Sequence, residues 1–157
     1  MSLLSVFTWC DQTALAIVMR DSTWLFPFVE TFHLLSLALL GGSVLLVDLR
    51  LLGLGLRSEP VDALAATVRP WMLGSLAVII VSGVLLFMSE VRKCYANQAF
   101  WMKMAFLTAA VLFTFTFRHR VISRTASELR SPQRLAALAS IMLWLGVGIT
   151  GRGIGFW

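Results

Sequence analysis

Charged residues are scarce in this chain of 157 residues: only 13% are Asp, Glu, Lys or Arg, whereas 59% are hydrophobic. A soluble domain carries roughly 25% charged residues. At this length a soluble fold would have too little polar surface to cover itself. The composition therefore predicts an integral membrane protein in contact with the lipid bilayer, and the length leaves room for one membrane domain, residues 1–157.

Cysteine and histidine are also sparse, with two of each. Cys10 and Cys94 form no Cys-x-x-Cys motif, which speaks against a disulfide scaffold and a structural zinc site. Two interpretations stay open for them: two free thiols, or one disulfide if both face an oxidising compartment. His33 and His119 fall near opposite membrane surfaces, so a site that uses both imidazoles is not expected.

The N-terminal segment lacks the basic residues of a secretory signal peptide. Asp11 and Asp21 also interrupt its apolar stretch, which a signal peptide would not tolerate. Residues 2–20 are therefore predicted to form an amphipathic helix that lies at the membrane interface.

Four apolar segments approach the roughly 20 residues that are needed to cross the hydrocarbon layer. Pro27 and Pro70 suit the first turns of two of them, where a missing N–H costs nothing. The predicted fold class is all-α: a four-helix transmembrane bundle with an N-terminal interfacial helix. The expected transmembrane helices cover residues 27–54, 70–88, 100–120 and 135–151.

The net charge of +5 is concentrated in the short connections between the apolar segments. This distribution is typical of topology-setting charge and not of a nucleic-acid interface, so no nucleic-acid partner is expected. The third connection is the most basic and is predicted to be cytoplasmic. Both termini then face the periplasm of a bacterial inner membrane that the chain crosses several times. The basic residues of the third connection are Arg118, Arg120, Arg124, Arg130 and Arg134.

Polar residues inside the apolar segments are the candidate functional residues, because they are costly in hydrocarbon and usually face a bundle interior. The first segment places six residues on one helical face by steps of three and four: Glu30, His33, Leu37, Gly41, Val44 and Asp48. Helix rise brings four polar side chains from three helices to one depth near the outer surface: Glu30, His33, Lys103 and Arg152. Asp48, Arg50, Arg69, Arg118 and His119 form a second group at the other surface, typical of helix-end charge.

The outer group suggests a haem site, because imidazole is a standard axial ligand of haem iron. His33 is the candidate metal ligand, with Glu30 beside it. Lys103 and Arg152 would pair with the anionic propionates. Aromatic side chains would line the flat ring: Phe28, Phe32, Trp101 and Trp144. Two structural interpretations stay open, namely an ion pair of Glu30 with Lys103 or Arg152, and a His33 that only hydrogen-bonds between helices.

Other functions also fit these residues. Copper is less favoured than haem, because Met102 and Met104 point in different directions on a helix. In a small oligomeric channel or transporter, Glu30, His33 and Asp48 would line a proton or ion path. A third alternative is a non-catalytic accessory subunit of a larger membrane complex. The sequence does not decide whether the protein is an enzyme.

Three motifs are distinctive: Phe26-Pro27 with Glu30 and His33, Gly41-Gly42 followed by Asp48-Leu49-Arg50-Leu51-Leu52-Gly53, and the closing Gly151-Arg152-Gly153-Ile154-Gly155-Phe156. Through them nearly the whole chain resembles a bacterial four-helix membrane family catalogued as a domain of unknown function. The resemblance implies a fold and a membrane location, but not an activity.

One further segment, Phe100-Trp101-Met102-Lys103-Met104-Ala105-Phe106, resembles the lysine-bearing helix of the copper-resistance D proteins and of the HemJ-type protoporphyrinogen oxidases. In HemJ-like proteins a first-helix histidine and this lysine are implicated around haem b. The resemblance therefore implies haem b, with His33 and Lys103 at the matching positions.

Overall fold

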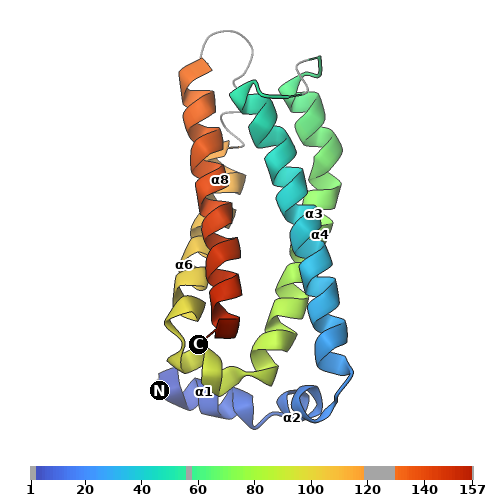
Figure 1. The fold of residues 1–157 in the computed structure, drawn as a ribbon, viewed down its shortest axis with the longest axis vertical. Helices are drawn as coiled ribbons and strands as arrows, with labels where there is room; N and C mark the ends of the chain where they lie inside the picture. The colour runs from blue at the N-terminus through green and yellow to red at the C-terminus, as the bar shows by residue number, and fades with distance from the viewer. Residues whose placement is uncertain (1–2, 56–57, 119–129, 157) are drawn as a thin grey trace.

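The computed structural model describes residues 3–55, 58–118 and 130–156 (Figure 1). These residues form helices and contain no strand, and four of the helices are long and apolar enough to cross a membrane. The predicted all-α fold with four membrane-spanning helices is thereby confirmed. Three residues named in the sequence-based predictions lie outside the described residues: His119, Arg120 and Arg124.

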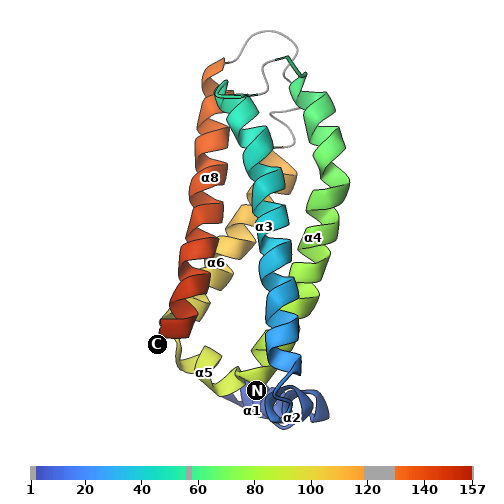
Figure 2. The same ribbon diagram turned by 45° about the vertical axis from the view of Figure 1, so that its right-hand side comes forward.

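The four long helices run up and down between two ends of the bundle (Figures 1 and 2). They are α3 (Leu25–Leu52), α4 (Val61–Ser89), α6 (Gln98–Phe113) and α8 (Arg130–Gly153). A π-helical turn, η1 (Thr114–Arg118), continues α6. A short 3-10 helix, η2 (Ile154–Phe156), follows α8. We call the end with the turn from α3 to α4 the turn end, and the opposite end, with both chain termini, the terminal end.

Helix α4 begins nine residues earlier than the proline-based expectation. Its first residue is Val61, and Pro70 lies inside the helix and not in its first turn. The uncharged apolar segment does begin near Pro70, but residues 61–69, which include Asp62 and Arg69, continue the helix toward the turn end. Gly53 closes α3 at φ 77°, a left-handed conformation that favours glycine. The N–H groups of Gly53 and Leu54 there donate to the last carbonyls of α3.

Three short helices form an end layer at the terminal end: α1 (Leu3–Asp11), α2 (Ala14–Asp21) and α5 (Val91–Ala96) (Figure 2). The segment expected to be one interfacial helix is thus divided in two. Thr13 caps α2 by accepting a hydrogen bond from the Ala16 N–H at 3.3 Å. Asp11 is 7% exposed and joins the three helices, because its carboxylate pairs with Arg20 at 3.1 Å and with Arg92 at 2.7 Å.

The long helices pack as two pairs. Helix α3 lies along α4, and α6 lies along α8, while α3 also contacts α8 between the pairs. Two clusters of buried side chains fill the interior, one centred on Leu40, Val44, Leu76 and Ile79 and the other on Val47, Leu51, Val61 and Ala137. We call them the central cluster and the turn-end cluster. Val111 of α6 and Trp144 of α8 pack against the central cluster and so connect both helix pairs.

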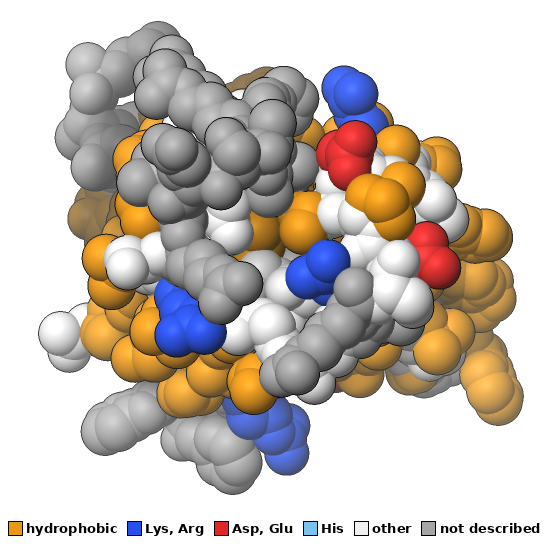
Figure 3. Space-filling model, turned by 90° about the horizontal axis from the view of Figure 1, so that it is seen from above, with side chains coloured by type: hydrophobic (Ala, Val, Ile, Leu, Met, Phe, Trp, Pro, Cys, Tyr) orange, Lys and Arg blue, Asp and Glu red, His pale blue; other side chains and the backbone are white. Residues whose placement is uncertain are grey.

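Most of the lateral surface is apolar and exposed, including large residues such as Leu35, Val81 and Ile149. A soluble bundle would bury such side chains, but a bilayer solvates them. Basic and acidic side chains are seen on the turn end from above, with hydrophobic side chains around the flanks (Figure 3). The chain is therefore a multi-pass membrane protein whose helices contact lipid.

The α6–α8 contact depends on Gly146. A Cβ at this position would lie 2.7 Å from Cδ1 of the Phe106 ring, which is too close for an undistorted contact. We expect Gly146→Ala to destabilise the folded protein by about 1–3 kcal/mol, because the ring must shift in a packed interior. The midpoint of thermal unfolding in detergent, followed by circular dichroism, measures this loss.

Gly148 provides the matched control on the same helix. A Cβ there meets nothing within 4 Å, so Gly148→Ala is expected to leave the midpoint unchanged or raise it slightly. Equal effects of the two substitutions would contradict the assigned contact between Gly146 and Phe106.

Candidate functional site

His33 lies between α3 and α4 and is 8% exposed. Its Nδ1 atom is 2.8 Å from the Ser82 hydroxyl oxygen, in a buried hydrogen bond between the two helices. The neighbouring Gly83 lets the ring lie against α4, since a Cβ at Gly83 would be 3.4 Å from the His33 Cε1 atom. The imidazole is thus held against the backbone of α4 at a serine–glycine step.

Ser82 belongs to a repeat of three serines at seven-residue intervals, with Ser75 and Ser89. All three are buried, and each hydroxyl also donates to a carbonyl of its own helix. Ser82 alone among them also contacts the imidazole. Sequence reasoning did not identify Ser82 as a site residue, although the seven-residue repeat marks the buried face of α4.

Lys103 approaches the same region from α6. Its side chain is half-buried and runs along α8 at Gly151, where a Cβ would lie 3.6 Å from the lysine Cε. The ammonium group is an electrostatic neighbour of both His33 and Cys94. Of the four polar residues expected at one depth, His33 and Lys103 are thus electrostatic neighbours.

Glu30 and Arg152 lie at the surface near the terminal end, and both are exposed. Glu30 forms no ion pair with the side chains that the structure describes, so neither Lys103 nor Arg152 neutralises it there. Its position five residues after the start of α3 lets the carboxylate reach the polar headgroup region.

Trp101 and Trp144 occupy two different environments. Trp101 is 42% exposed, packs near Phe7 and Phe100, and donates from Nε1 to the Tyr95 carbonyl at 3.1 Å, so it belongs to the aromatic contacts of the end layer. Trp144 lies deeper, against the central cluster, and its Nε1 donates to the Thr114 hydroxyl at 3.3 Å. The two indoles are therefore not neighbours around one ring.

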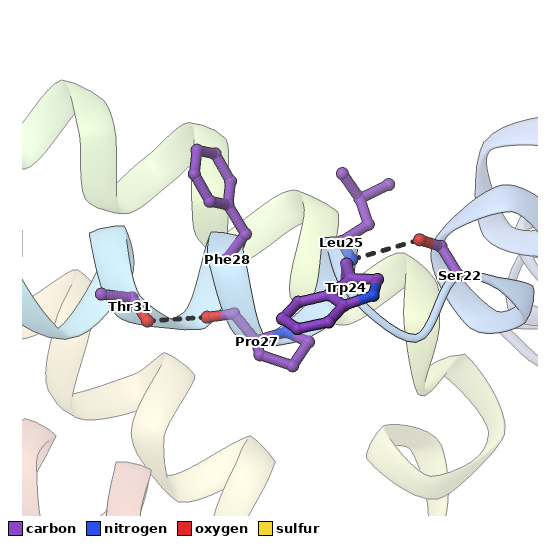
Figure 4. Close-up of a pocket in the computed structure, with 6 residues that line it drawn as sticks. All are labelled: Ser22, Trp24, Leu25, Pro27, Phe28 and Thr31. Atoms are coloured by element: carbon purple, nitrogen blue, oxygen red, sulfur yellow. Dashed lines mark hydrogen bonds between the residues drawn. The ribbon is translucent and has the colours of Figure 1, made fainter.

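Phe28 and Phe32 pack against each other on an exposed face of α3. Phe28 lines a shallow surface depression with Ser22, Trp24, Leu25, Pro27 and Thr31 (Figure 4). From Trp24 to His33 is nine residues, or about two and a half helical turns, so this depression faces away from His33. It is open to the lipid side and does not extend the histidine site.

Asp48 lies on the buried side of α3 near the turn end and is fully enclosed. It is 15 residues from His33, which corresponds to about 22 Å along the helix axis. Arg50 beside it donates from Nε to the Glu59 carbonyl at 2.7 Å, and Arg69 is exposed. Asp48 and His33 thus lie on the interior side of one helix but at different depths.

Within the described residues no three His, Cys, Asp or Glu side chains come close enough together to hold a metal ion.

The family model of DUF6644, a family of unknown function, matches residues 6–157. The chain belongs to DUF6644. Comparisons with curated proteins and with solved structures give no match. Membership confirms the predicted resemblance to a family of unknown function, and it leaves the activity of this DUF6644 protein to be argued from the site itself.

Both cysteines of the DUF6644 chain are buried free thiols, Cys10 in α1 and Cys94 in α5. Burial, and then the nearby Glu90 carboxylate, raise the pKa of the Cys94 thiol, although Lys103 and Lys93 oppose this shift. Because the thiolate is the nucleophile, a raised pKa lowers reactivity at a given pH.

We expect Cys94 in a Cys10→Ser variant to react with iodoacetamide about tenfold or more slowly than an exposed thiol at neutral pH. The rate should rise as the pH approaches the raised pKa. Ala96→Cys in a variant without Cys10 and Cys94 is the matched control, since residue 96 is exposed on the same short helix. Equal rates would contradict the assigned burial, and wild-type labelling that needs prior reduction would instead reveal a disulfide.

Proposed function

We propose that this DUF6644 protein binds haem b through His33, near the outer face of a bacterial inner membrane, and takes part in membrane redox chemistry. The observation that supports this proposal is a buried imidazole in the part of the bundle nearest the terminal end, with its Nδ1 atom hydrogen-bonded to Ser82. Imidazole nitrogen is a standard axial ligand of haem iron.

The donor set around His33 fits such a cofactor. The Ser82 hydroxyl meets the ring at Nδ1, and the Ile79 backbone of α4 is a further hydrogen-bond partner of His33. Lys103 adds an amine nearby, and Arg152 adds a guanidinium at the terminal end. His33 would hold the iron, and these two cations would bind the propionates. Glu30 would limit the net positive charge of this region.

Haem, when bound, supplies one-electron chemistry, while the protein supplies the ligand, the burial and the charges that tune it. A haem b site at His33 and Lys103 is also what the expected resemblance of residues 100–106 to the lysine-bearing helix of HemJ-like proteins would imply. Trp101 would contribute apolar surface to the haem site from the end layer, and Trp144 would do so from the central cluster. The two indoles would not face each other across one haem pocket.

Wild-type protein purified gently in detergent is expected to show a Soret band. His33→Ala should remove most of the band or shift it, because it deletes the axial nitrogen. His119→Ala is the control, since it removes the only other histidine of the chain. A colourless wild-type protein, or a band unaffected by His33→Ala, would refute haem binding at this position.

A second function is favoured by the enclosed carboxyl group of Asp48 on the same helix as His33. Ionisable side chains inside a membrane bundle often mark proton or ion paths. In such an oligomeric channel or transporter the protein would be colourless, and flux in proteoliposomes would fall in Asp48→Asn and Glu30→Gln. A non-catalytic accessory subunit would show neither a Soret band nor flux, and it would co-purify with a larger complex.

We further propose that both termini face the periplasm, because the basic third connection would be retained in the cytoplasm. A C-terminal alkaline phosphatase fusion is then expected to be active, whereas a C-terminal green fluorescent protein fusion should be dark. The opposite pattern would invert the topology and place His33 near the cytoplasmic surface.

A further inference from the structure

The hydrogen bonds of Ser82 carry an inference about the chemical state of His33. We propose that Ser82 is a positioning residue, which holds the imidazole as the Nδ1–H tautomer and leaves Nε2 as the atom that would bind iron. The assignment of the tautomer stands on the geometry alone, whereas the role of Nε2 rests on the proposed haem function.

The tautomer follows from the number of protons available around the Ser82 hydroxyl oxygen. The Ser82 Oγ atom lies 2.6 Å from the Val78 carbonyl oxygen and 2.8 Å from the His33 Nδ1 atom. A carbonyl can only accept, so the short contact to Val78 requires the hydroxyl proton. The Ile79 carbonyl, at 3.4 Å, offers that proton a weaker acceptor on the same helix. With its one proton used, Oγ accepts, and Nδ1 must supply the hydrogen.

The consequence for the ring follows from imidazole chemistry. A neutral imidazole carries one proton, so a proton on Nδ1 leaves a lone pair on Nε2. Gly83 keeps the ring against α4 by leaving room for Cε1. Histidine ligands in proteins are oriented in the same way, because a partner of the second nitrogen fixes the tautomer and raises the basicity of the first.

Ser75 provides a matched control seven residues earlier on α4. It is buried like Ser82, and its hydroxyl likewise donates to carbonyls of its own helix, those of Trp71 and Met72. It does not contact the imidazole. Ser75→Ala therefore removes the same kind of side-chain-to-backbone hydrogen bond as Ser82→Ala, but it does not remove a contact with His33.

The first experiment needs no cofactor. In a His119→Ala background His33 is the only histidine, so ¹⁵N chemical shifts of labelled histidine, measured well above the ordinary imidazole pKa of about 6.5, report its tautomer directly. The Nδ1–H form should predominate in this background and in Ser75→Ala, and Ser82→Ala should lose that preference. Predominance of the Nε2–H form before any change at Ser82 would overturn the proposal.

The second experiment titrates the detergent-solubilised full chain with haem. Ser82→Ala is expected to weaken binding by about tenfold or more and to raise the midpoint potential, since Nε2 becomes a poorer donor. Ser82→Thr, which keeps the hydroxyl, should restore both properties, and Ser75→Ala should change neither. Unchanged binding and potential in Ser82→Ala would refute the positioning role. If wild-type protein binds no haem, the proposed function fails, while the tautomer measurement still decides the assignment.

Discussion

The structure depends on one constraint: a hydrocarbon environment offers no water to polar groups, so a polar group without a partner inside the protein is costly. Five hydroxyl groups on the spanning helices find such a partner locally, whereas the enclosed hydroxyl of Ser140 on α8 has none among the described residues. The hydroxyl groups of Thr31, Ser43, Ser75, Thr108 and Thr150 donate to carbonyls of their own helix four residues earlier. An imidazole does not form this hydrogen bond to its own helix, because its ring extends beyond the helix that carries it. His33 is therefore paired with a second helix, and its hydrogen bond to Ser82 fixes how α3 and α4 are rotated against each other.

The same constraint explains the end layer. Asp11 lies where three short helices meet, and a carboxylate that is 7% exposed requires cationic partners. Arg20 and Arg92 supply them from α2 and α5, while their own side chains stay partly in contact with the surroundings, at 45% and 79% exposure. Asn97 secures the other side of this end, since it caps α6 through the Ala99 N–H and donates to the Ile154 carbonyl near the C-terminus. Both termini are thus attached to the connection between α4 and α6, close to the depth of Lys103.

Composition and the lengths of the apolar segments were sufficient to predict the membrane location and the four helices, since both follow from transfer energies that single segments carry. The rotation of each helix was harder to predict. Glu30 and His33 are three residues apart and were placed on one face, but the structure buries His33 and exposes Glu30, because the bundle interior is narrow and Glu30 is close to a helix end. Trp101 and Trp144 were expected to line one flat ring, yet they contact different layers. Ser82 was missed because the seven-residue serine repeat marks the buried face of α4 but does not reveal the partner across the interface.

The rotation of α3 links the two buried ionisable groups of that helix. Residues 33, 40, 44, 47, 48 and 51 are all buried, and this series continues from the histidine to Asp48 without a change of face. Rotating α3 about its axis to bury Glu30 more deeply would turn the opposite edge of this series of buried residues toward lipid. The exposure of Glu30 and the burial of His33 therefore both result from the rotation of α3 about its axis, which its contacts with α4 and α8 determine. Any chemistry at His33 is consequently sensitive to packing far along the bundle, because the same rotation sets the environment of both groups.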